Sequence, residues 1–239
     1  MVNEKFTSAV ICAAGASSRM KGAAGKSKQL LSFGGMTVLE RTVNAFMNDG
    51  VTDEIIIVCP VELTEDFSKL FENAPKTKPI RFAKGGAERQ ISVKNGVDAC
   101  DERAEIIVVH DGARPFVTPN LIMQVTQDGD KYGCATLAVP VKDTIKIARD
   151  GVVCDTPPRD ELFAVQTPQV FVKSLYLKAF ASAEEKGIIC TDDCRLIELY
   201  GGTVKITAGD YNNIKITTPE DIVLADAITE ARSAVSLEN

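Results

Sequence analysis

Short apolar runs alternate with amphipathic stretches along most of the chain. Five apolar runs have the length of strands and cover residues 9–13, 54–59, 80–83, 105–110 and 134–139. Helical periodicity fills the stretches between them, at residues 37–48, 63–72, 88–100 and 120–128. Strands that are covered on both faces are apolar throughout rather than alternating. The pattern therefore predicts an α/β fold with a Rossmann-like, mostly parallel sheet and helices on both faces.

The rhythm changes after Pro140. Residues 142–149 alternate between polar and apolar positions, Asp150-Gly151 follows, and a second apolar segment covers 152–154. An Asp-Gly pair between two such segments is a strong signal for a β-hairpin. We expect residues 142–158 to project as a hairpin arm. Its apolar side could be buried against a second subunit, as a dimerisation arm, or folded onto its own domain.

The remaining sequence returns to the α/β pattern. It predicts a strand at 161–165, a helix near 174–186, a helix at 192–200 and a strand at 203–207. The last helix has a clear start, because Thr218 can cap it and Pro219 suits its first position. No repeat, low-complexity segment or linker divides the chain. We expect a single domain over residues 1–239, with the hairpin as its arm.

Composition narrows the classes of function. The chain has 239 residues, a formal net charge of -6 and seven cysteines. Its acidic balance and lack of basic runs argue against nucleic acid as a partner. The apolar runs are too short to span a membrane, and the first residues contain no signal core, so we expect a cytoplasmic protein. Several cysteines lie in strand-like runs, which favours reduced thiols; Cys190 and Cys194 lack the second ligand pair that structural zinc needs.

The segment from Val10 to Lys28 has the features of a phosphate-binding loop. An apolar strand runs into small residues at Ala13, Ala14 and Gly15, and two cations follow, Arg19 and Lys28. Small residues let backbone N–H groups approach an anion closely. In an acidic chain this favours a nucleoside triphosphate, although an ordinary strand–turn–helix remains open. Neither a Walker A loop nor the G-x-G-x-x-G fingerprint fits the spacing.

Glycines and polar residues follow the other predicted strands, and ligands bind beyond the carboxyl ends of strands in parallel sheets. They are Gly85, Gly86, Glu88, Arg89 and Ser92 after the third strand, Asp111 and Arg114 after the fourth, and Asn213, Lys215 and Thr217 near the C-terminus. Asp111 is a candidate Mg²⁺ ligand, although a turn or capping role, or an ion pair with Arg114, is also open. His110 is the single histidine, and we expect it to be structural. Without a nucleophile–base pair, electrostatic catalysis of phosphoryl-type transfer is the natural mechanism.

These segments together resemble one enzyme family over residues 9–227. The motifs are AAG with Arg19-Met20, Lys28-Gln29, GG-x-ER with Ser92, VHDGARP at 109–115, PVKDT at 140–144, QTPQ at 166–169, TDD at 191–193 and NIKIT at 213–217. In order and at these spacings, they are similar to the 2-C-methyl-D-erythritol 4-phosphate cytidylyltransferases of non-mevalonate isoprenoid synthesis. That family has a nucleotide-diphospho-sugar-transferase-like fold and forms homodimers through embracing arms.

The resemblance implies a role for each matching residue. It makes Arg19, Lys28, Arg159 and Lys215 the catalytic cations, and Asp111 the ligand of Mg²⁺. The CTP site would contain Ala13, Ala14, Gly15, Gly86, Arg89 and Ser92. Methylerythritol phosphate would be bound by Asp111, Arg114, Thr144, Arg159, Thr191 and Lys215. In a dimer Thr144, together with Arg159 as a further candidate, would serve the partner's site.

Two departures and two alternatives accompany the resemblance. Ser27 replaces the proline that commonly precedes the lysine of the first loop, so the loop 21–27 is expected to act as a mobile lid. Ala87 stands where relatives often carry aspartate, which leaves base recognition to backbone groups and Ser92. The first alternative is the sister enzyme ribitol 5-phosphate cytidylyltransferase. The second, of another class, is a non-catalytic nucleotide-binding module.

Overall fold

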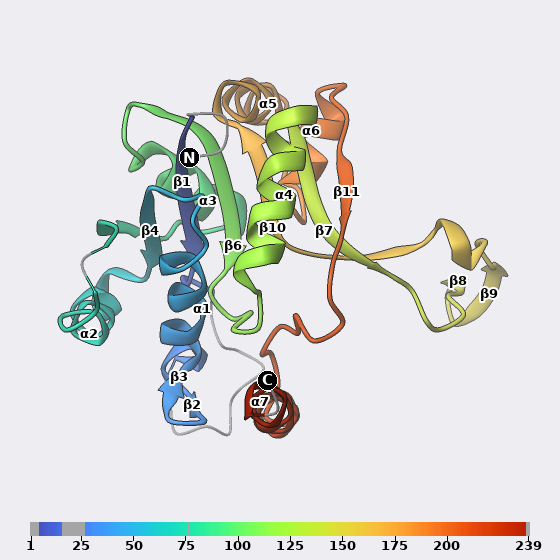
Figure 1. Ribbon diagram of the computed structural model, residues 1–239. Helices are drawn as coiled ribbons and strands as arrows, with labels where there is room; N and C mark the ends of the chain where they lie inside the picture. Colours follow the sequence, from blue (N-terminus) through green and yellow to red (C-terminus); the bar gives the residue numbers. More distant parts are fainter. Residues whose placement is uncertain (1–4, 16–26, 76, 238–239) are drawn as a thin grey trace.

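A central sheet forms the body of the protein (Figure 1). The computed structural model describes residues 5–15, 27–75 and 77–237. Within that part of the chain, a seven-stranded sheet has the order β11-β7-β10-β6-β1-β4-β5. Its strands are β1 (Phe6–Cys12), β4 (Glu54–Cys59), β5 (Ile80–Lys84), β6 (Ala104–Asp111), β7 (Cys134–Pro140), β10 (Phe163–Val172) and β11 (Lys205–Ala208). The predicted Rossmann-like α/β architecture is confirmed.

The sheet is parallel except for β10, which is antiparallel to both β6 and β7. Predicting a strand at 161–165 was wrong in its extent, because β10 continues to Val172 through Gln166, Thr167 and Pro168. Proline cannot donate to a ladder and usually marks a bulge or an edge. The pairing of β10 with β7 does skip register between Val165 and Gln169, which accommodates Pro168.

Helices cover both faces of the sheet and divide the core into two apolar layers (Figure 1). One layer lies under α1 (Val38–Met47), α2 (Thr64–Leu70) and α4 (Pro119–Tyr132). The other lies under α3 (Arg89–Asp98), α5 (Lys173–Glu185) and α6 (Cys194–Leu199). Each helix starts or ends within a few residues of its expected position. Thr37 caps α1 in a capping box with Glu40, and Thr118 caps α4.

A small hairpin and the last helix close one end of the molecule. The hairpin, β2 (Ser32–Phe33) and β3 (Met36–Thr37), has two residues per strand, too short to produce a periodic signal in the sequence. Its Phe33 packs with Phe116 and Ile228 in a third apolar cluster, which seats α7 (Glu220–Leu237) below the sheet (Figure 1). None of the described helices is long and apolar enough to cross a membrane. The cytoplasmic location stays a prediction.

The predicted hairpin arm is present and projects away from the sheet (Figure 1). It consists of β8 (Ile147–Arg149) and β9 (Val152–Asp155), joined by Asp150 and Gly151 with φ angles of 50° and 78°. Two successive positive φ values define the type I′ turn that Asp-Gly favours. The alternation over 142–149 predicted a longer strand, which is wrong for residues 142–146. Every residue from Lys142 to Thr156 is exposed, so the arm is not folded onto its own domain.

Three short 3-10 helices complete the described chain. They are η2 (Lys28–Leu30), η3 (Val61–Leu63) and η4 (Arg159–Glu161). The first follows the phosphate-binding loop, and the last lies where the arm rejoins the sheet at β10. η2 carries Lys28 and η4 carries Arg159, two of the predicted catalytic cations.

Candidate active site

A cleft of about 450 Å³ lies at the carboxyl ends of β1 and β6. The strand order reverses between these two strands. After β1 the chain adds β4 and β5 on one side of β1, and β6 then follows on the other side of β1. Open parallel sheets bind their ligands at such a point. The cleft is lined by Cys12, Ala14, Gly15, Lys28, Gln29, Gly86, Ala87, Glu88, Arg89, Ser92, Asp111, Ala113 and Lys215. The topology thus gathers residues of all four predicted segments at one place.

The first wall of the cleft is the loop after β1. The Ala13 N–H donates to the Val58 carbonyl at 2.7 Å, which keeps the chain in line with the sheet until Ala14 and Gly15 reach the cleft. Lys28 reaches the same cleft from η2. The next residue of η2, Gln29, is buried. Ser27 lies before η2, and its hydroxyl donates to the Gln29 side chain at 2.5 Å. Arg19 and the predicted lid at 21–26 lie outside the described residues.

The second wall is the loop from Gly85 to Ser92. The Gly86 N–H donates to the Ser92 hydroxyl at 2.9 Å, and that hydroxyl donates to the Glu88 carbonyl at 3.1 Å. A Cβ on Gly85 would lie 2.5 Å from the Cβ of Ala14, so the two loops touch only because residue 85 is glycine. Ser92 therefore shapes the loop, and its oxygen is already engaged by the loop's own backbone.

We expect Ser92→Ala to raise the apparent Kd for CTP, the ligand that the resemblance implies, by about fivefold, because a hydrogen bond worth about 1 kcal/mol holds the loop in shape. The change is to be read by titration calorimetry. Ser68→Ala is the matched control, since Ser68 makes a similar local bond to the Glu65 carbonyl at 2.9 Å on an exposed helix. Equal CTP binding by both variants would contradict a role for Ser92 in the nucleotide site.

Asp111 ends β6 and stands among three cations. Its carboxylate lies 2.8 Å from the Lys215 Nζ, 3.6 Å from the nearest Arg89 nitrogen and 3.7 Å from the Arg114 Nε. Burial acts to raise the Asp111 pKa, but the charges of Lys215 and Arg89 outweigh it and hold the pKa below its ordinary value. Asp111 is therefore an ionised carboxylate facing the cleft, which suits a hard divalent cation shared with phosphate oxygens.

Arg89 is held from behind by Asp193. The two side chains form an ion pair at 2.5 Å, and the Asp193 side chain is 1% exposed. Burial acts to lower the Arg89 pKa, yet the carboxylates of Asp193 and Asp111 raise it above its ordinary value. The Gln169 side chain in turn accepts from the Asp193 N–H at 3.1 Å. The guanidinium is therefore permanently charged and fixed at the edge of the cleft.

His110 is fully buried behind Asp111. Burial lowers its pKa to about 4, so the ring is neutral at neutral pH. The Thr167 hydroxyl lies 3.0 Å from its Nδ1, the Arg114 carbonyl lies 3.1 Å from its Nε2, and the ring packs against Phe46. The prediction that His110 is structural agrees with this setting.

The buried His110 predicts how stability depends on pH. Its folded pKa lies below the ordinary value of 6.5, so as pH falls the unfolded chain takes up a proton first. Stability is complete above pH 6.5 and is lost as pH falls towards 4, by about 3 kcal/mol in all. The His110→Asn variant has no imidazole and does not show this loss of stability. The carboxylates are the same in both proteins, so their contribution cancels when the two pH dependences are subtracted. Urea unfolding at pH 7 and pH 4.5 measures the difference, and parallel losses in both proteins would contradict a neutral buried imidazole.

Several predicted substrate residues lie outside this cleft. Thr144 is exposed in the arm, and Arg159 is exposed at its base, where it donates to the Lys142 carbonyl at 3.1 Å. Thr191 is exposed in the loop before α6. Arg114 stands behind Asp111 and donates to the Asn213 carbonyl at 2.7 Å, which agrees with its alternative role of holding the loop. Within one chain the structure therefore brings together Ala14, Gly15, Lys28, Gly86, Arg89, Ser92, Asp111 and Lys215.

Sequence reasoning did not assign roles to three buried polar residues behind the cleft. Asp193 anchors Arg89, Thr167 accepts from the Asp111 N–H at 3.0 Å, and the Asn213 amide donates to the Thr167 carbonyl at 2.9 Å. All three lie in motifs that carried the resemblance. In the sequence, each of these three residues stands in a motif that the predicted substrate contacts already explained. The motif alone does not show which side chain or backbone group the residue bonds to.

Comparison with known proteins places the chain. The sequence profile of the 2-C-methyl-D-erythritol 4-phosphate cytidylyltransferases matches residues 7–231. The enzyme of that name from Caldanaerobacter subterraneus subsp. tengcongensis is 47% identical over 221 residues, 92% of this chain and 96% of the relative. The one from Bacillus velezensis is 45% identical over 225 residues, 94% and 96% of the two chains.

Solved structures agree with the sequence relatives. The 4-diphosphocytidyl-2C-methyl-D-erythritol synthase of Anaerococcus prevotii superposes with a TM-score of 0.85 at 34% identity, covering 95% of this chain and 99% of the other. The 2-C-methyl-D-erythritol 4-phosphate cytidylyltransferase of Thermus thermophilus gives 0.76 at 33% identity, with 94% and 99% covered.

Fold and cleft together define a nucleotidyltransferase, with a loop of small residues, fixed cations and one ionised carboxylate at the switch point of a mostly parallel sheet. The profile match and the close relatives narrow the class further. This chain belongs to the 2-C-methyl-D-erythritol 4-phosphate cytidylyltransferase family.

Proposed function

We propose that the protein transfers the cytidylyl group of CTP to 2-C-methyl-D-erythritol 4-phosphate and releases pyrophosphate, as a step of non-mevalonate isoprenoid synthesis. The observation that carries the proposal is the cluster of Lys28, Arg89 and Lys215 around Asp111 in one cleft, in a chain of this family. Such a cluster offers a polyanion several fixed charges in a site with low-dielectric walls.

The reaction balances without a covalent enzyme intermediate. A phosphate oxygen of the alcohol phosphate attacks the α-phosphorus of CTP, and the bond from that phosphorus to the bridging oxygen of the β-phosphate breaks as pyrophosphate leaves. Charge spreads over the non-bridging oxygens in the transition state, so positioned cations supply most of the catalysis. Lys28 and Arg19 bind the triphosphate, and Lys215 orients the incoming phosphate.

Asp111 fits the role of metal ligand. It is ionised, it faces the cleft, and a single carboxylate with substrate phosphates is a common magnesium environment. When bound, Mg²⁺ would neutralise phosphate charge. Lys215 at 2.8 Å from Asp111 keeps the carboxylate oriented.

The arm supports the proposal of a homodimer with shared sites. Its exposed apolar side chains are Ile145, Ile147, Val152 and Val153, with Phe163 and Val165 at its base. Val152 is 71% exposed and Val153 55% exposed, so the hairpin has little apolar cover within its own chain. A second copy of the same arm would cover these side chains and bring Thr144 and Arg159 to the partner's cleft, where their predicted substrate contacts would be made.

The test is pyrophosphate release from CTP and Mg²⁺ with methylerythritol phosphate, and with ribitol 5-phosphate in a parallel reaction. Release only with methylerythritol phosphate supports the proposal. Release only with ribitol 5-phosphate keeps the chemistry and reassigns the substrate. CTP binding without release from either alcohol phosphate would indicate the non-catalytic nucleotide-binding module instead.

A further inference from the structure

The histidine next to Asp111 has no part in the reaction as described so far. Its side chain is fully buried, yet both ring nitrogens have polar partners. We infer that His110 is a positioning residue that fixes Asp111, acting through the hydroxyl of Thr167. The inference rests on the proposed function, because it assigns His110 a task in the same site.

The hydrogen bonds around the ring have one consistent direction. The Asp111 N–H donates to the Thr167 hydroxyl oxygen at 3.0 Å. A carbonyl oxygen only accepts, so the 3.1 Å bond between the His110 Nε2 and the Arg114 carbonyl places the ring proton on Nε2. In the neutral ring Nδ1 is then an acceptor, and the Thr167 hydroxyl, 3.0 Å away, donates its proton to it. One imidazole thus holds both ends of the turn from Asp111 to Arg114.

This turn also holds the segment that carries Lys215. The Arg114 N–H closes the turn on the Asp111 carbonyl at 3.0 Å, and the Ile216 N–H donates to the Ala113 carbonyl at 2.8 Å. The Asn213 amide donates to the Thr167 carbonyl at 2.9 Å. The strands β6 and β10 are neighbours in the sheet (Figure 1), so His110 and Thr167 connect two rigid elements. Asp111 and Lys215 therefore share one support, and His110 lies at its centre.

Loss of the ring acceptor has a specific consequence. The Thr167 hydroxyl must find another acceptor, and its hold on the Asp111 N–H loosens. A displacement of about 1 Å in a catalytic group can reduce turnover by about 10²-fold. The wall from Gly85 to Ser92 has no described hydrogen bond to His110, and its Arg89 is held by Asp193 at 2.5 Å more closely than by Asp111 at 3.6 Å, so nucleotide binding there is expected to remain. The expected signature is a fall in kcat without a matching loss of CTP affinity.

The first experiment reads the ring directly and needs no turnover. The chain contains one histidine, so ¹⁵N-histidine labelling gives a single imidazole spectrum. At pH 7 we expect a neutral ring with its proton on Nε2 and slow exchange of that proton with solvent. A proton on Nδ1, or a charged ring, would overturn the hydrogen-bond direction on which the inference depends. This result is independent of whether the enzyme accepts either alcohol phosphate.

The second experiment compares three substitutions. Asparagine places an acceptor near the position of Nδ1, glutamine places a donor near that of Nε2, and phenylalanine keeps the packing against Phe46 with neither. At saturating substrates we expect kcat to fall by about tenfold to hundredfold in His110→Phe and His110→Gln, with substantial recovery in His110→Asn. CTP affinity should change by less than about twofold in all three.

The design separates this role from a purely structural one. Stability is measured for each variant, and Thr167→Val with Thr167→Ser repeats the comparison from the other side of the bond if His110→Phe does not fold. Serine should retain turnover, and valine should lose it to a similar extent as His110→Phe. Equal kcat in all variants, or a parallel loss of CTP affinity and kcat, would overturn the inference. An inactive wild-type enzyme would refute the proposed function first, and the ring spectrum would still decide the positioning.

Discussion

Lys28→Ala is expected to lower kcat by about 10²-fold or more at saturating CTP, the scale for losing one preorganised group that stabilises the transition state. Lys28 reaches the cleft from η2 beside buried Gln29, so its position is fixed by the fold. In the proposed reaction, its ammonium binds the triphosphate on which charge develops in the transition state. Steady-state pyrophosphate release measures the effect.

Lys94→Ala is the matched control for that variant. Lys94 is also a lysine of this part of the chain, but it does not line the cleft and pairs with Asp98 at 2.6 Å. We expect its loss to leave turnover within about twofold of wild type, since exposed ion pairs contribute about 1 kcal/mol or less. Near-normal turnover in Lys28→Ala would remove Lys28 from the catalytic cations.

Mixing two inactive variants is expected to restore activity if the arm serves the partner's site. Thr144→Ala removes a side chain that a subunit contributes to its partner's site. Lys28→Ala removes a side chain that the subunit contributes to its own cleft. In a mixed dimer one cleft then contains both defects and the other contains neither. Random exchange makes about half of the dimers mixed, each with one intact cleft of two, so recovery approaches about a quarter of wild-type activity.

The measurement needs subunits that exchange, by co-expression or by mild denaturation and refolding of the mixture. Lys28→Ala mixed with Lys215→Ala is the control, because both residues line the same cleft of one chain. If all residues of a site came from one chain, mixed dimers would gain nothing in the first mixture. No rescue with Thr144→Ala, in a sample shown to contain mixed dimers, would mean that Thr144 does not serve the partner's site.

The sequence was sufficient for the parts of the fold that repeat a simple pattern. Apolar strands such as β4 and β6, and the capped helix α1, appear close to their expected bounds because burial on one or both faces determines them locally. The Asp-Gly turn of the arm is equally local. The full extent of β10 could not be predicted in this way, because Pro168 interrupts its apolar pattern. Its antiparallel pairing also depends on β6 and β7, which are distant in the sequence.

The site divides in the same way. Lys28, Asp111 and Lys215 could be predicted because charged residues at strand ends indicate a ligand, and their convergence on one cleft agrees with that reading. The pairing of Arg89 with Asp193 could not, since 104 residues separate the two in the chain. The role of Thr167 in holding Asp111 also depends on the contact between β6 and β10. Long-range polar partners of this kind become visible only in three dimensions.

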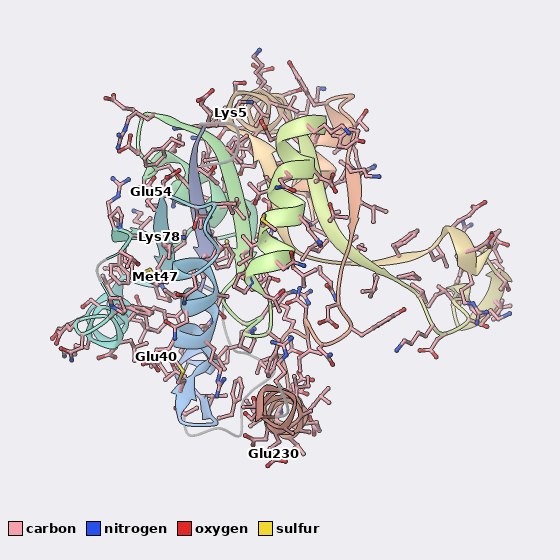
Figure 2. All side chains as sticks on the ribbon, viewed as in Figure 1. Lys5, Glu40, Met47, Glu54, Lys78 and Glu230 are labelled. Carbon is pink, nitrogen blue, oxygen red and sulfur yellow. The ribbon has the colours of Figure 1, made fainter. Side chains whose placement is uncertain are left out.

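The electrostatic framework extends well beyond the cleft. Glu54 and Lys78 are both labelled in Figure 2, and each lies in a further ion pair near the β4 side of the sheet. Lys78 contacts Asp49 at 2.7 Å, and Arg81 contacts Glu54. The first pair joins the loops that precede β4 and β5, and the second joins β4 to β5. They account for buried acidic residues that the reaction does not use.

The burial of the only histidine has a consequence for kinetics. Histidine is the side chain whose ordinary pKa brings a change of charge between pH 5 and 8, and here its pKa lies at about 4. Asp111 remains ionised throughout that range, and Arg89 remains protonated. Phosphate monoesters, in contrast, take up their second proton near pH 6. In the proposed reaction we therefore expect an acidic limb of the rate profile near neutrality to report the ionisation of the incoming phosphate monoester, and not that of His110, Asp111 or Arg89.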